Sequence, residues 1–266
     1  MDDMKPKGLT RRLALVLLLA SPHAARAAQG PPEALALVDA MIEAHGGLKK
    51  WAGAKTVSFV DEFRFGEATS GQKTQVTVEQ GKRRAYIDIV GTDMRMAWDG
   101  EKAWSEGWQV PMPPRFLALL NYYFLNLPWL ARDPGVNLSP PGTAKIRGDG
   151  TEYRTVKMTF DPGTGDTPDD YYLLYIHPET HRLRATEYIV TYRSILPEGV
   201  ASSPSHLLVF DETATVGGLV VPTHYTIYEG DQVYASCAVS DWSFEKPFDP
   251  SRLEMPEGGV VDRSTP

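Results

Sequence analysis

The sequence predicts a mainly β (α+β) fold, in which a strongly curved antiparallel sheet or incomplete β-barrel accompanies an N-terminal helix and a hydrophobic lid or plug helix. Three observations lead to this prediction. From residue 56 onward, runs rich in Val, Thr, Tyr, Phe and Ile alternate with period two. Short turn sequences separate the runs, which makes neighbouring strands antiparallel. One apolar segment of helical length, residues 116–130, interrupts them.

Length and composition bound the architecture. The chain has 266 residues, 42% hydrophobic and 23% charged, with a formal net charge of −7. This composition is that of a globular protein, and the aromatic residues suffice for one large core, so we expect a single domain at residues 28–266. The acidic balance argues against a nucleic-acid partner, because phosphate binding requires a basic surface.

Residues 1–27 have the pattern of a secretory signal peptide. Four basic residues between positions 5 and 12 precede the apolar run 13–20, and Ala25-Arg26-Ala27 offers the small-x-small pattern of a cleavage site. The apolar run is shorter than the ~20 residues that cross a bilayer. We therefore expect a soluble periplasmic protein with no transmembrane segment in the mature chain.

Residues 31–45 are predicted to form the N-terminal helix. Pro32 suits a first turn, and Glu33 is favoured at the positive end of the helix dipole. Gly46-Gly47 ends the helix. The apolar side chains that share its buried face are Leu35, Val38, Met41 and Ile42.

About twelve strands follow, joined by turns such as Asp99-Gly100 and Gly230-Asp231. Twelve strands are more than one open sheet holds without curling, so the sheet is expected to curve and to have an inner face. The predicted strands cover residues 56–65, 73–80, 83–90, 93–98, 102–108, 144–148, 151–160, 170–177, 182–192, 205–215, 220–229 and 232–244.

Several of these strands are apolar on both faces. At 171–176 both alternate sets of side chains are apolar or aromatic, as expected when both faces of a sheet are covered. Met94, Met96 and Trp98 share one face of another strand. A concave face lined in this way requires a helix, a ligand or both to fill it.

The segment 116–130 is the candidate for that filling. Twelve of its fifteen residues are apolar or aromatic, and Pro113-Pro114 suits a helix start. A helix that is hydrophobic all round cannot lie on an exposed surface, and this one is too short and too interrupted by Pro128 to span a membrane. Two interpretations stay open: a core helix that plugs the barrel mouth, or a movable lid or membrane-touching segment.

The C-terminal residues 247–266 contain four Pro and one Gly-Gly pair, which predicts an extended strap with a frayed end and no regular element. The single cysteine, Cys237, cannot form an intramolecular disulfide. It lies in a strand-like run, and we expect a buried small hydrophobe rather than a reactive thiol.

Nearly the whole mature chain resembles a known superfamily. A helix that ends His45-Gly46-Gly47, followed by Leu48 and Trp51 and then by a meander of long strands, is similar to the LolA/LolB-like superfamily of periplasmic lipoprotein carriers, which includes the RseB sensor. The hairpin at 171–184 resembles the superfamily's recurrent strand, Asp-Pro-x-Thr turn, strand feature, with His177 in place of Asp. The resemblance implies an incomplete barrel whose helices cover an apolar cavity, and a role in holding acyl chains or another hydrophobic molecule.

The leading hypothesis is a non-catalytic periplasmic binding or carrier protein for a lipid or acyl chain. Lipoprotein sorting is a weaker expectation than hydrophobic-ligand binding, because no particular arginine matches the one that gates the lid in classical carriers. Arg95, Arg115 and Arg184 are candidates that no motif supports. The predicted wall and lid residues are Met94, Met96, Trp98, Phe116, Leu120, Tyr123, Phe124 and Trp129.

Two other classes of function stay open. An RseB-like sensor would bind an envelope protein partner according to the occupancy of its cavity. A lipid-acting hydrolase would require His45 or the acidic loop 161–170, although a helix end suits His45 as a cap and a hairpin loop suits solvated carboxylates. His177 and His181 flank a turn instead of sharing a helix face, so no metal site is predicted. The sequence has no serine-nucleophile elbow and no phosphate or dinucleotide motif, and no cofactor is expected.

Overall fold

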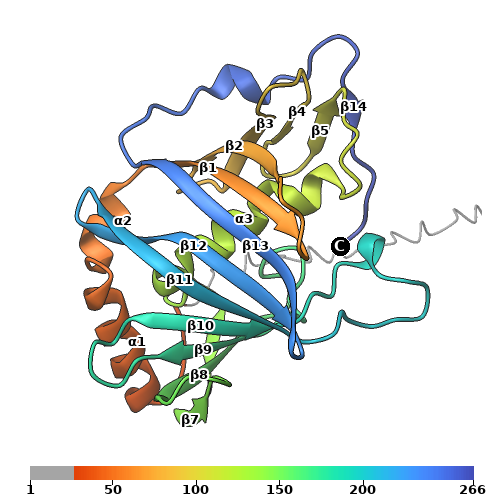
Figure 1. Cartoon of the computed structure of the whole chain (residues 1–266). Coiled ribbons are helices and arrows are strands. Elements are labelled where there is room, and N and C mark those ends of the chain that lie inside the picture. Colours follow the sequence, from red (N-terminus) through yellow and green to blue (C-terminus); the bar gives the residue numbers. More distant parts are fainter. Residues whose placement is uncertain (1–26) are drawn as a thin grey trace, which may run out of the picture.

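One antiparallel sheet of 14 strands curves around a long helix (Figure 1). The computed structural model describes residues 27–266, and the predicted signal peptide lies outside them except for Ala27. The helices are α1 (Pro32–Ala44), α2 (Leu48–Gly53) and α3 (Pro114–Leu130). The strands are β1 (Thr56–Phe65), β2 (Gln72–Glu79), β3 (Arg84–Ile89), β4 (Arg95–Trp98), β5 (Ala103–Glu106), β6 (Val136–Leu138), β7 (Gly142–Lys145), β8 (Glu152–Phe160), β9 (Tyr172–Ile176), β10 (Leu183–Tyr188), β11 (His206–Val216), β12 (Leu219–Glu229), β13 (Gln232–Ser243) and β14 (Val260–Val261).

Two meanders make up this sheet. Strands β1 to β5 lie side by side in chain order, as do β8 to β13, and the two series meet where β1 pairs with β13. The outermost strands β14 and β6 do not pair with each other, so over residues 27–266 the sheet remains open. The predicted mainly β fold with an incomplete barrel is confirmed. None of the helices in the described part of the chain is long and apolar enough to cross a membrane.

The sheet buries apolar side chains on both faces. Along β9, Tyr172, Leu174 and Ile176 belong to the main core on the concave side, whereas Tyr175 belongs to a second cluster with Tyr153 on the convex side. This alternation confirms the interpretation of a strand covered on both faces. In the adjoining half of the sheet the C-terminal residues cover the convex face of β3 to β5, because Phe248 and Leu253 pack there.

Cys237 lies in the interior of the sheet. It is only 1% exposed and sits in register with Phe63 of β1 and Tyr225 of β12. Burial among these side chains raises the pKa of the thiol, because the thiolate would lose its hydration. The prediction that Cys237 is a buried small hydrophobe is confirmed.

Three short elements were not predicted from the sequence. They are α2, β6 and β14, and β14 lies in the C-terminal segment for which no regular element was expected. That expectation is wrong: Val260 and Val261 pair with Ser105 and Trp104 of β5, and a single 3₁₀ turn forms at Pro250–Leu253. The free backbone groups of an edge strand accept a two-residue partner of almost any sequence, so no periodic signal marks such a strand.

The His-Gly-Gly helix end joins α1 to the sheet. Gly46 and Gly47 have φ angles of +105° and +86°, which only glycine adopts easily. The backbone N–H of Val220 in β12 donates to the carbonyl of His45 at 3.0 Å, beside the two-residue turn Gly217-Gly218. A Cβ on Gly46 would lie 2.2 Å from the carbonyl oxygen of Gly218. The two glycines therefore allow the helix end and the hairpin to meet backbone to backbone.

Gly46→Ala should consequently lower the free energy of unfolding by about 2–4 kcal/mol, because it adds both left-handed strain and a backbone clash. Gly53→Ala is the matched control, since a Cβ there meets nothing within 4 Å. It should change stability by no more than about 1 kcal/mol. Urea unfolding of the two variants measures the difference, and equal midpoints would contradict the packing argument.

Candidate functional site

Helix α3 lies across the concave side of the sheet (Figure 1). From Phe124 to Leu130 every residue is buried, whereas most residues from Arg115 to Tyr123 are only half-buried. The second half is thus a core plug that meets α1 and the sheet, and the first half faces unfilled space. The buried second half agrees with the core-plug interpretation, whereas the movable-lid interpretation of the first half stays a prediction.

A cavity of about 730 Å³ lies between the first half of α3 and the concave face of the sheet. Phe63, Val76 and Ile87 line it from β1, β2 and β3, and Leu117 and Leu120 line it from α3. The lining is predominantly apolar. Concave sites of about 300–1,000 Å³ with such a lining are typical of small-molecule binding sites.

The cavity has an apolar rim that is open to solvent. Phe65, Val200 and Tyr234 line it while remaining 53%, 37% and 38% exposed. The rings of Phe65 and Tyr234 pack edge to face, with centroids 5.8 Å apart. An exposed cluster of large apolar side chains at the opening of a cavity is typical of an entrance for an apolar ligand.

A second cavity of about 430 Å³ lies on the other side of α3 and is more polar. Arg115 and Asp166 are among its lining residues. Phe116, Leu120 and Phe124, spaced four residues apart, line both cavities. This stripe on one face of α3 therefore forms much of the wall between the two spaces.

The structure distributes the eight residues of the predicted site over three environments. Phe116, Leu120 and Phe124 line both cavities, and Trp98 and Tyr123 line only the second. Met94, Met96 and Trp129 line neither of the two.

Core packing accounts for the last group. Trp129 is 1% exposed, stacks on Trp51 with ring centroids 4.6 Å apart, and meets His45 edge to face at 6.1 Å. Met96 is also 1% exposed, and Met94 packs against the same core. A helix with apolar side chains on every face gives no sequence signal for which side meets a cavity and which meets the core.

A buried carboxyl group lies in the wall of the large cavity. Asp61 of β1 is 1% exposed and accepts hydrogen bonds from the Thr74 hydroxyl and, at 2.5 Å, from the Asn121 amide of α3. The Tyr225 hydroxyl donates to the Asn121 carbonyl oxygen at 3.3 Å. Burial raises the pKa of Asp61 to about 6, against the lowering effect of its two donors. The sequence analysis missed this group, although Asp61 shares the inward alternation of Phe59 and Phe63.

The histidines considered as candidate catalytic or metal-binding residues make contacts within their own local structure. His45 is buried, and its Nδ1 donates to the carbonyl of Met41 at 2.8 Å. This hydrogen bond confirms the interpretation of His45 as a helix cap. Burial lowers the pKa of this imidazole to about 4. His177 Nδ1 accepts from the backbone of its own turn, and residues 27–266 contain no cluster of three or more metal-binding side chains.

The acidic loop 161–170 is not simply a solvated hairpin, and that expectation is corrected. Asp166 accepts two hydrogen bonds from the guanidinium of Arg115, at 2.7 and 2.8 Å. Asp170 is 7% exposed and accepts from the backbone and the hydroxyl of Thr191, at 2.7 and 2.8 Å. The loop therefore fixes neighbouring segments, including the start of α3.

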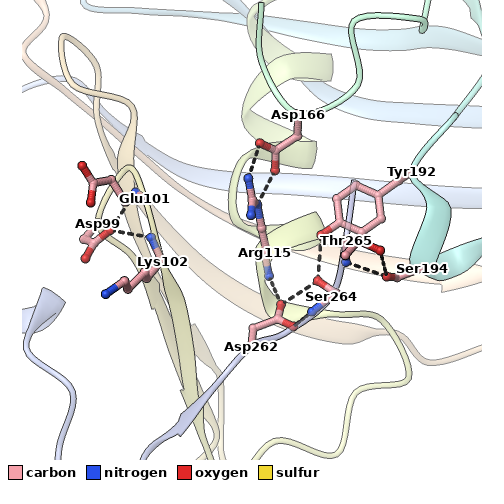
Figure 2. A network of polar contacts seen from close by, with 10 residues as sticks. All are labelled: Asp99, Glu101, Lys102, Arg115, Asp166, Tyr192, Ser194, Asp262, Ser264 and Thr265. Atoms are coloured by element: carbon pink, nitrogen blue, oxygen red, sulfur yellow. Dashed lines mark hydrogen bonds and ion pairs between the residues drawn. The ribbon is translucent and has the colours of Figure 1, made fainter. Parts of the chain in front are cut away.

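The C-terminal residues cap α3 from a distance (Figure 2). No side chain at the N-cap position, Pro113, can satisfy the first free N–H groups of the helix. Asp262 Oδ2 instead accepts from the backbone N–H of Arg115 at 2.7 Å. Ser264 and Thr265 hold this segment in place through Tyr192 and Ser194, each with a contact of 2.7 Å. The cap of the cavity-facing half of α3 thus comes from residues near the end of the chain.

Comparison with known proteins identifies the fold. No protein-family model and no curated protein matches the sequence. The structure is similar to a LolA superfamily protein from Nitrosomonas europaea, with a TM-score of 0.50 and 11% identity over 84% of this chain and 98% of the other. It is also similar to a DUF1329 family protein from Desulfovibrio piger, with a TM-score of 0.52 and 9% identity over 83% and 97%. The chain has a LolA-like fold, and the structural resemblance inferred from the His-Gly-Gly helix end is confirmed.

The raised pKa of Asp61 predicts a pH-dependent contribution to stability. The folded state retains this proton up to about pH 6, whereas the unfolded chain releases it near pH 4, so stability should fall as the pH rises through that window. Relative to Asp61→Asn, the wild-type free energy of unfolding should decrease by about 2–3 kcal/mol between pH 4 and pH 7. Chemical denaturation of both proteins at pH 4 and pH 7 measures this difference. His45 contributes a pH dependence of opposite sign, but it does so equally in both proteins and cancels in the comparison. If the free energy of unfolding changed with pH by the same amount in both, the raised pKa of Asp61 would be contradicted.

The distant cap predicts a local effect of Asp262→Ala. Loss of a helix cap costs ~1 kcal/mol, which corresponds to about five-fold faster amide exchange in the first half of α3. The amides of the buried second half should be unaffected. Asp249→Ala removes a cap of the same kind within the C-terminal segment, at Ser251, and serves as the control. Hydrogen exchange with mass spectrometry distinguishes the two variants, and an identical pattern in both would refute the cap.

Proposed function

We propose that this protein is a non-catalytic carrier that binds a lipid or acyl chain in the cavity between α3 and the concave face of its LolA-like sheet. The observation that carries the proposal is the cavity itself, which is apolar, about 730 Å³ in volume and bordered by exposed apolar side chains at its rim. The signal-peptide pattern of residues 1–27 supports a periplasmic location.

Apolar burial would supply the binding free energy. Each Å² of hydrocarbon surface removed from water contributes ~25 cal/mol, so a long chain against Phe63, Val76 and Leu117 gains affinity without any covalent step. Release requires only that the chain return to another apolar environment. The half-buried first half of α3 supports such exchange, since its side chains can shift with less disturbance of the core than those of its buried second half.

Phe116, Leu120 and Phe124 are proposed as the part of the predicted site that touches the ligand. They line the large cavity from α3. Trp98 and Tyr123, which line the smaller cavity, are proposed to contact a ligand only when the wall formed by the three α3 residues moves aside. The alternative is an RseB-like sensor, in which the occupancy of the cavity alters binding to an envelope protein partner.

Two leucines of α3 provide a matched test of the cavity. Leu117 lines only the large cavity and Leu119 only the smaller one, and both are half-buried. Leu117→Trp should fill the proposed site and weaken binding of a fluorescent C16 fatty-acyl probe about ten-fold or more, whereas Leu119→Trp should remain within about two-fold of wild type. Fluorescence titration of the purified variants measures both affinities.

Thermal unfolding of both variants establishes that each is folded before the titration. If both variants lost the same fraction of their affinity for the probe, the large cavity would be rejected as the binding site. Absence of probe binding in the wild type would reject lipid binding and favour the RseB-like sensor that binds an envelope protein partner.

A further inference from the structure

A buried histidine whose ring nitrogens make no hydrogen bond lies in the wall of the large cavity. His206 begins β11 and is 6% exposed, and neither its Nδ1 nor its Nε2 makes a hydrogen bond. Leu208 and Phe210, on the same side of β11, belong to the concave core. A buried polar group without a partner costs free energy, so such a group within a binding cavity indicates a ligand atom that completes it.

The surroundings of His206 leave few protein partners for the ring. In the cross-strand register it lies between Tyr188 of β10 and Glu229 of β12. Its ring stacks on that of Tyr188, with centroids 5.5 Å apart. The carboxylate of Glu229 comes within 3.2 Å of Nε2 but outside hydrogen-bonding alignment, and its side chain is 48% exposed.

A β-bulge places a second aromatic ring over His206. Ile227 pairs with Ala235 and Tyr228 pairs with Val233, so Tyr234 is the extra residue of β13. Its ring centroid lies 4.7 Å from that of His206, and its backbone carbonyl accepts from the N–H of Gly66 at 2.8 Å. Bulges redirect side chains in this way and occur often beside functional sites. His206 is thus held just inside the rim.

Aromatic contacts connect His206 with α3. The ring of Tyr188, which stacks on His206, lies 4.6 Å from that of Phe124. Phe124 belongs to the stripe that walls the cavity, and all three side chains line it. An extended chain with one end at His206 would therefore lie on a continuous apolar surface that reaches α3.

The charges that line the cavity restrict the end group of that chain. Asp61 and Glu229 are acidic, and the guanidinium of the lining residue Arg64 already donates to Glu62 at 3.0 Å. Among the described lining residues no other Lys or Arg is present. A carboxylate or phosphate at His206 would face Glu229 without a free cation to offset the repulsion. A hydroxyl group carries no charge that Glu229 would repel, and it can donate a hydrogen bond to a ring nitrogen or accept one from it.

We propose that the cavity selects single-chain lipids whose end group is an uncharged hydroxyl, such as monoacylglycerols, and that His206 is the residue that recognises this hydroxyl. The inference rests on the proposed function and adds the chemical class of the ligand. The acyl chain occupies the space along α3, and the hydroxyl completes the hydrogen bonding of His206 inside the rim.

Three ligands of equal chain length test the proposal: monolauroylglycerol, laurate and methyl laurate, each displacing the uncharged fluorophore N-phenyl-1-naphthylamine at pH 7.5. In the wild type, monolauroylglycerol should bind about ten-fold tighter than laurate. His206→Phe retains the aromatic packing and removes the nitrogens. This variant should bind monolauroylglycerol about five-fold or more weakly than the wild type does, and its affinity for methyl laurate should stay within about two-fold of the wild-type value.

Glu229→Gln is the second variant. It changes an exposed side chain, so the proposal can be tested even if His206→Phe does not fold. Glu229→Gln should strengthen laurate binding about three-fold or more and leave the affinity for methyl laurate unchanged. Two results would overturn the selectivity while leaving lipid binding intact. One is that the wild type binds laurate and monolauroylglycerol equally well. The other is that His206→Phe loses the same fraction of its affinity for monolauroylglycerol and for methyl laurate. If none of the three ligands displaces the fluorophore, lipid binding and the selectivity fall together.

Discussion

The architecture depends on one geometric constraint, which is that few helices must cover the apolar concave face of a wide sheet. A helix is ~10–12 Å across and strands are ~4.8 Å apart, so α3 covers the width of about two or three strands. The sheet has 14 strands and the core also takes in α1, yet space remains beside the first half of α3. The cavity is the part of the concave face that this helix does not reach.

The same constraint explains why α3 has two different halves. Its second half is buried against α1 and the sheet, and Trp129 stacks there on Trp51. Its first half has open space on both sides and lacks a side-chain cap of its own. Asp262 and Asp166 compensate by binding Arg115 through its backbone and its side chain (Figure 2). The cavity wall is thus positioned by polar contacts from distant segments, whereas the plug is positioned by packing.

Much of the fold follows from local patterns. Strand β1 begins and ends at the predicted residues, the helix end at His45-Gly46-Gly47 forms as expected, and the apolar segment becomes α3. The site was less predictable. The apolar residues of 116–130 carry similar signals, so Phe124 at the cavity and Trp129 in the core could not be told apart. Asp61 and His206 lie far apart in sequence, and only the register of β1, β11 and their neighbours brings them to one cavity.

By itself the sequence determined the class of this protein, because period-two alternation, turn glycines and an apolar helix are short-range signals that act within a few residues. The tertiary structure decided where the sheet stops, which half of α3 is buried, and which polar side chains face the cavity. It also decided that the C-terminal residues pair with β5 and cap α3. Those features depend on contacts between segments that are tens to more than a hundred residues apart, and no local period encodes them.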